Sequence, residues 1–142
     1  MFLGRFSHTI DTKGRLAIPV RFRNTLGNDA VITRGIDRCL SLYPMDTWQP
    51  FAEKVSALSV SDPDARTFRR MVFAEAAHVE FDRQGRILIP PELRTYAGFD
   101  RDVIVVGMNT YVEIWSPEQW DSQATMMERE GSSIAQRLAT LI

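Results

Sequence analysis

The stretch DTKGRLAIP, Asp11 to Pro19, decides how this sequence is interpreted, because it recurs further along the chain as DRQGRILIP, Asp82 to Pro90. Each copy places an aspartate, a glycine and an arginine at the same spacing, followed by an apolar run that ends in proline. An internal repeat has to be recognised first, because it sets the architecture of the whole chain. We therefore interpret the 142 residues as two copies of one module.

The repeat extends well past the phrase itself. Matching residues continue from Arg23 to Trp48 in the first copy and from Arg94 to Trp120 in the second, with a one-residue insertion or deletion between them. The sequence thus predicts a first module, a helical linker, a second module and a C-terminal helical tail, over residues 5–48, 49–75, 76–120 and 121–142 respectively.

Each copy predicts the same series of short elements. Aspartate accepts hydrogen bonds from backbone N–H groups two residues on, and glycine supplies the positive φ of a tight turn. The proline that ends each phrase suits the first position of a helix, so we expect helices over Val20–Leu26 and Pro91–Ala97. Strand-forming runs follow each helix, at Ala30–Thr33, Cys39–Tyr43, Val103–Val106 and Tyr111–Trp115.

The short strands favour one fold built from both copies. A module of about four short strands and one small helix cannot bury both faces of its sheet alone. Two copies in one chain can close on each other about a pseudo-two-fold axis, and closure removes the exposed strand edges. We therefore predict an α+β fold, a β-barrel built from two internal repeats with helical segments between and after them.

The linker and the tail are predicted to be helical. We expect a helix capped by Asp46 that runs to about Leu58, and a new helix after Ser61–Pro63. In the tail, Ser116 is expected to cap a helix and Gly131 to interrupt it. The last segment carries an apolar stripe that packs either on its own barrel or on a neighbouring subunit, formed by Ile134, Leu138, Leu141 and Ile142.

Composition excludes several classes of protein. No apolar run approaches the roughly 18 residues that a membrane span needs, and the N-terminus lacks a signal-peptide layout. Cys39 is the only cysteine, so there is no internal disulfide framework and no CxxC metal pair. These features favour a cytoplasmic protein without a membrane partner.

Charged residues around the two turns are the candidates for function. Net charge is −1, but basic residues are in excess over residues 1–44 and acidic ones over 105–142. Arginine suits phosphate oxygens and base edges in the major groove. We predict a basic DNA-binding face made of Lys13, Arg15, Arg83 and Arg86, on turns built by Asp11, Gly14, Asp82 and Gly85. A plainer interpretation stays open, in which each aspartate caps its turn and only pairs with its arginine.

Both phrases resemble the D-x-x-x-R core of SpoVT–AbrB type DNA-binding modules. Two such modules in a chain of this length, with an MFxG start and the elements Leu42–Pro44 and Glu113–Ser116, resemble the MraZ family of transcriptional regulators. The resemblance implies a swapped-hairpin, double-split barrel and ring-shaped homo-oligomers. It further implies binding to short direct repeats in promoter DNA of the division and cell-wall gene cluster, and a nucleoid-associated location.

The two copies match the family motif, but they differ in one basic residue of the turn. Asp11 and Arg15, like Asp82 and Arg86, match the family motif, but Gln84 stands where the first copy has Lys13. We therefore expect the first copy to make the stronger contact with DNA.

Other functions fit the sequence less well than DNA binding. Paired aspartates on a pseudo-two-fold barrel could share a proton as in an acid protease, but an adjacent arginine would keep each carboxylate ionised. A non-enzymatic interaction module that binds a partner through its helices is the better alternative. His8 and His78 are isolated in the sequence, and we expect no metal, cofactor, small-molecule substrate or enzymatic activity.

Overall fold

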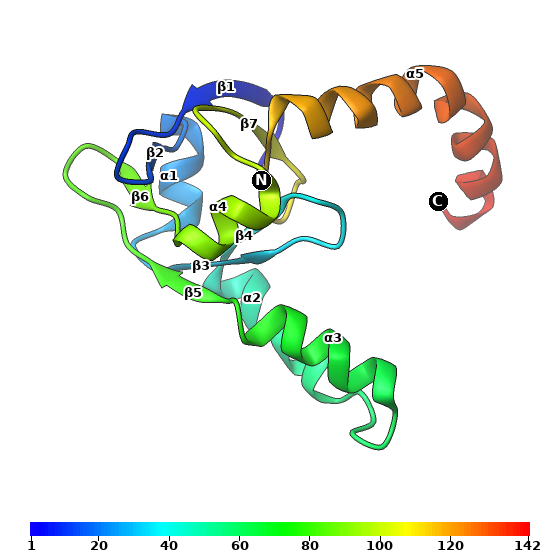
Figure 1. Cartoon of the computed structure of the whole chain (residues 1–142). Coiled ribbons are helices and arrows are strands. Elements are labelled where there is room, and N and C mark those ends of the chain that lie inside the picture. The colour runs from blue at the N-terminus through cyan, green and yellow to red at the C-terminus, as the bar shows by residue number, and fades with distance from the viewer.

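The computed structural model describes all residues, 1–142, as an α+β fold with a six-stranded and a two-stranded antiparallel sheet (Figure 1). The elements follow one another as β1 (Arg5–Thr9), β2 (Arg15–Ala17), α1 (Val20–Leu26), β3 (Ala30–Arg34), β4 (Leu40–Pro44), α2 (Met45–Ser56), α3 (Pro63–Phe73), β5 (Ala77–Val79), β6 (Arg86–Leu88), α4 (Pro91–Ala97), β7 (Asp102–Gly107), β8 (Val112–Trp115), α5 (Pro117–Leu138) and a terminal 3-10 turn, η1 (Ala139–Leu141).

The two copies exchange strands in the large sheet, whose order is β1-β7-β8-β4-β3-β5. Strand β1 of the first copy pairs with β7 of the second, and β5 of the second copy pairs with β3 of the first. In the middle of the sheet, β4 and β8 join the copies with Leu40 opposite Ile114. Neither copy therefore completes its sheet without the other.

The two repeated phrases are hydrogen-bonded to each other. Strands β2 and β6 form the small sheet, with Leu16 opposite Ile87. The ladder continues into the turns, because Ile18 N donates to Gly85 O at 3.2 Å and Ile89 N donates to Gly14 O at 2.9 Å. The phrase that repeats along the sequence is thus also the place where the copies meet.

Apolar residues of both phrases enter a single core. Leu16, Ile18, Ile87 and Ile89 are fully buried in it, together with residues from the large sheet and from the two short helices. Polar and charged residues of the phrases stay at the surface, because side chains alternate between the faces of a strand. The core therefore holds the turns at one end of the molecule.

The closed barrel that we expected from the sequence is not confirmed. The outer strands of the large sheet, β1 and β5, are paired on one side only, and β2 and β6 form a separate sheet. The short β2 and β6 strands pair with each other, and the isolated bridge between Ile10 and Leu16 does not extend this sheet into β1. The fold class is α+β with an antiparallel sheet and five helices.

Most helix predictions are confirmed, and two details are wrong. Helices α1 and α4 have the expected bounds, and Asp62 and Ser116 accept capping bonds from Asp64 N and Gln119 N. However, α2 begins at Met45 without a side-chain cap, so Asp46 lies inside its first turn.

Helix α5 runs through Gly131 without a break. A glycine costs about 1 kcal/mol in a helix interior, which the good helix formers on both sides of it outweigh.

The terminal apolar stripe does not pack on its own chain. Helix α5 leaves the body and extends away from it (Figure 1), and Leu138, Leu141 and Ile142 are exposed. Helices α2 and α3 form a second projection, in which the ring centroids of Trp48 and Phe73 are 6.0 Å apart. None of the helices combines the length and the hydrophobicity that crossing a bilayer requires.

Two neighbouring residues of β6 test whether the small sheet stabilises the fold. Ile87 is 1% exposed and Leu88 is 58% exposed. We expect Ile87→Ala to lower the free energy of unfolding by about 2–5 kcal/mol, because it leaves a cavity in the core. Leu88→Ala is the control, with an expected change within about 0.5 kcal/mol. Denaturant titration measures both, and equal losses would contradict the placement of β6.

Candidate nucleic-acid interface

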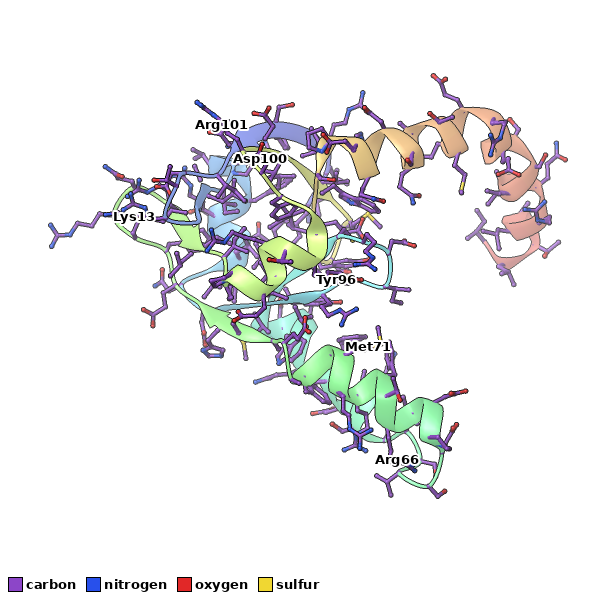
Figure 2. The ribbon with its side chains drawn as sticks, in the orientation of Figure 1. Lys13, Arg66, Met71, Tyr96, Asp100 and Arg101 are labelled. Atoms are coloured by element: carbon purple, nitrogen blue, oxygen red, sulfur yellow. The ribbon has the colours of Figure 1, made fainter.

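Two turns lie at the end of the molecule opposite to α5, one at each end of the short β2–β6 ladder. They connect β1 to β2 and β5 to β6, and the pairing of β2 with β6 fixes their separation. Figure 1 shows both turns at the left of the view, and Figure 2 shows Lys13 pointing outward from the same end. The sequence-predicted residues of both copies are therefore brought to one surface.

Asp11 organises the first turn through hydrogen bonds to backbone and side chain. Its Oδ1 accepts from Lys13 N at 3.0 Å and from Arg15 N at 2.9 Å, and its Oδ2 accepts from Arg15 Nε at 2.6 Å. Gly14 has φ of +86°, a conformation that residues with a Cβ rarely adopt. This geometry explains the spacing of the Asp, Gly and Arg in the phrase.

Asp82 organises the second turn in the same way. Its Oδ1 accepts from the backbone N–H groups of Gln84 and Arg86, both at 2.9 Å, and its Oδ2 accepts from Arg86 Nε at 2.8 Å. Gly85 has φ of +73°. An interaction of 3.8 Å between Arg86 Nη1 and Asp11 Oδ2 links the two turns.

Both turn carboxylates are kept ionised. The backbone N–H of Arg15 is the main cause that lowers the pKa of Asp11, with further contributions from its guanidinium and from Lys13 N. The N–H of Arg86 does the same for the pKa of Asp82. Because the folded pKa values are lowered, these bonds favour the folded turns at neutral pH and are lost as the pH falls below about 4. A shared proton of the acid-protease kind would need a raised pKa in one aspartate.

The four predicted DNA-binding residues divide into two kinds. Lys13 and Arg83 are exposed at the tips of their turns, whereas Arg15 and Arg86 are partly buried at the base. Asp11 is the only protein partner of the Arg15 side chain and engages its Nε, so both Nη groups remain available. The structural role of the aspartates and a contact with DNA by the arginines are therefore compatible.

Sequence reasoning missed two further arginines at the turns. A Cβ atom at Gly14 would lie 2.8 Å from Cζ of Arg94, and one at Gly85 would collide with the guanidinium of Arg23. Each of these arginines also donates from Nε to a carbonyl oxygen of its own copy, Ile89 O for Arg94 and Ile18 O for Arg23. Each guanidinium thus covers the turn glycine of the other copy. The sequence shows that Arg23 and Arg94 recur at matching positions of the two copies. It does not show that each of them contacts the turn of the other copy.

Other conspicuous residues have packing roles. Trp115 is buried and contacts Trp120, with ring centroids 5.9 Å apart, and Cys39 is buried beside it. Burial raises the pKa of the Cys39 thiol well above its usual range. His8 lies on β1, where burial and the nearby charge of Arg23 lower its pKa. None of these groups adds to the basic turn surface.

Comparison with known proteins agrees with the twofold organisation. The sequence model of one family, described as "MraZ protein, putative antitoxin-like", matches residues 1–71 and again residues 72–141. A protein from Thermomicrobium roseum is 73% identical over 142 residues, which is the whole of both chains.

Proteins from Roseiflexus castenholzii and Carboxydothermus hydrogenoformans are 48% and 44% identical over at least 99% of each chain. All three are named "Transcriptional regulator MraZ". With two family matches that together span residues 1–141 and full-length relatives at these identities, the chain belongs to the MraZ family.

Proposed function

We propose that this chain is a sequence-specific transcriptional regulator, not an enzyme, that binds short direct repeats in promoter DNA of the division and cell-wall gene cluster. The observation that carries the proposal is that the β2–β6 ladder holds two basic turns, one at each of its ends, on the same end of the molecule. The names of its relatives support a role in transcription. We place the protein in the cytoplasm, associated with the nucleoid.

Contacts with DNA are proposed for Lys13, Arg15, Arg83 and Arg86. The exposed tips of the turns suit phosphate oxygens, which position a protein on the duplex, and the oriented guanidinium groups at their base suit base edges. Arg15 donates from Nε to Asp11 Oδ2, which leaves the outer edge of that guanidinium to donate in a fixed direction. Residues 5–48 and 76–120 would act as the two DNA-binding modules, with 49–75 and 121–142 outside them.

One pair of turns supplies too few contacts for strong binding. Each neutralised phosphate adds about 0.9 to the slope of log K against log salt, so binding through a few contacts weakens at physiological salt. We therefore propose a ring-shaped homo-oligomer that presents several turn pairs to successive DNA repeats. Later contacts are then intramolecular, which raises the overall affinity by about 10²- to 10⁴-fold.

The remaining charge of the chain fits this mode of action. Net charge is −1, so binding has to come from the turn surface rather than from a generally basic protein. Helix α5 and the α2–α3 projection point away from the turns (Figure 1), which leaves the turns open to DNA in an assembly.

The two motif arginines test the proposal. We expect Arg15→Ala and Arg86→Ala each to weaken binding to promoter DNA by about 1–3 kcal/mol, roughly 5- to 150-fold, because each removes one oriented guanidinium. Arg129→Ala on α5 is the control for loss of a positive charge elsewhere, and it should bind like the wild type. Gel-shift titration measures affinity, and circular dichroism checks the fold. Unchanged affinity for DNA in both turn variants would contradict the proposal.

The unequal turns give a second test. Gln84→Lys restores in the second copy the cation that Lys13 provides in the first. We expect tighter DNA binding and a salt slope that is steeper by about 0.9 per added phosphate contact. Gln49→Lys adds the same charge on α2, and it should leave both quantities unchanged. If the two variants behave alike, net charge rather than the turn surface controls binding.

A further inference from the structure

Helix α5 presents an unpaired apolar seam. Its apolar and small residues recur at alternating intervals of four and three, the spacing of a coiled-coil contact face. The series starts at Trp120, which packs on Trp115 of the body, and continues unpaired through Ala124, Met127, Gly131, Ile134, Leu138 and, in the turn that follows, Leu141. No other helix packs along α5 (Figure 1), and Leu141 is 77% exposed. A seam of this length in solvent indicates a contact with another chain.

The first copy shows how such a helix is normally covered. Helix α2 occupies the place of α5 in the repeat, with Trp48 at the position of Trp120. There α3 folds back along the helix, so that Trp48 contacts Phe73 and Arg69 Nη1 donates to Ser56 O at 3.2 Å. Because α5 runs on through Gly131, the second copy has no equivalent of this cover.

A complementary apolar hollow lies elsewhere on the chain. A cavity of about 290 Å³ opens between α3, the β3–β4 loop and β8. Its apolar lining is formed by Ile36, Phe51, Phe68, Met71, Val72 and Met108. Ile36 at its rim is 83% exposed, and Figure 2 shows Met71 pointing from α3 toward the body. We call this hollow the α3 groove.

Charges on the two surfaces are also complementary. Helix α5 carries an acidic excess, from Glu118, Asp121, Glu128 and Glu130 against Arg129 and Arg137, whereas α3 carries a basic one, from Arg66, Arg69 and Arg70 against Asp64. At the groove, Arg34 has a buried Nε without a hydrogen-bond partner. Its guanidinium is already placed by Glu75 at 3.5 Å and by the Tyr96 ring at 4.0 Å.

Acidic groups on the opposite wall limit how α5 can lie in the groove. Asp37 and Glu113 line the cavity. Carboxylates of α5 would be repelled there, so they belong on the α3 and Arg34 side. The apolar seam then faces the aromatic and methionine side chains of the hollow.

We propose that the apolar seam of α5 in one chain packs into the α3 groove of a second chain. Helices α5 and α3, which carry the seam and the groove, project from different parts of the chain (Figure 1), so the contact is head to tail and can repeat until a ring closes. This inference rests on the proposed oligomer and names its interface. It leaves the basic turns, at the far end of the molecule, outside the contact.

Two exposed-residue variants separate the halves of the interface. The seam variant is Leu138→Glu with Leu141→Glu, and the groove variant is Ile36→Glu with Met108→Glu; all four positions are exposed, so the fold should tolerate them. Val60→Glu, at an exposed position between α2 and α3, is the matched control. Sedimentation of the full-length chain measures the mass of each variant and of mixtures.

A head-to-tail contact makes a specific prediction for the mixture. Each variant alone should lose the wild-type assembly, while Val60→Glu keeps it. Equal amounts of the seam and groove variants should form a two-chain complex and nothing larger, because only one intact seam meets one intact groove. On DNA with several repeats, each variant should bind about 10²- to 10⁴-fold more weakly, with little change on a single repeat.

Other outcomes overturn the inference and can be told apart from failure of the proposed function. If only the seam variant dissociates, α5 pairs with α5 of a second chain and the groove has no part in it. If both variants keep the wild-type mass, the interface lies elsewhere, and a monomeric wild type removes both the interface and the oligomer. If the masses behave as expected but no DNA is bound, the interface stands and the proposed function fails.

Discussion

The antiparallel pairing of β2 with β6 is the interaction on which the rest of the molecule depends. It joins the two repeated phrases, buries Leu16 and Ile87 in the common core, and fixes the distance between the two turns at its ends. Arg23 and Arg94 reinforce it, because each guanidinium covers the turn glycine of the other copy. The geometry of each turn therefore depends on both halves of the chain, and we propose that the pair of turns acts as one DNA-binding unit.

The opposite parts of the molecule have separate tasks in this account. The turns form a basic surface on a chain whose net charge is −1, while α5 and the α2–α3 projection extend away from it (Figure 1). In the proposed assembly, contacts through the projections would multiply the turn pairs without covering them. Affinity for DNA can then arise from several weak contacts held at fixed distances, which also makes it sensitive to salt and to repeat spacing.

Sequence features predicted the local structure well and the pairing between copies poorly. Proline before α1 and α4 and glycine after them fixed these helices, and the Asp–Gly–Arg spacing fixed the turns. Strand patterns say which residues are extended but not which strand lies beside them. The family resemblance implied swapped hairpins, but the sequence did not predict which strands pair or that the large sheet stays open. The crossing of Arg23 and Arg94 is likewise a tertiary contact, although both arginines recur in the repeat.

The central claim, that two turns act as one DNA-binding unit, is tested most directly by a double-mutant cycle. Affinity for DNA with a single repeat would be measured for the wild type, Arg15→Ala, Arg86→Ala and the double variant. The account predicts that the two losses are not additive, with a coupling of at least about 0.5 kcal/mol, as expected for groups in one network. Losses that add within about 0.3 kcal/mol would mean that the turns bind independently, and would contradict the account.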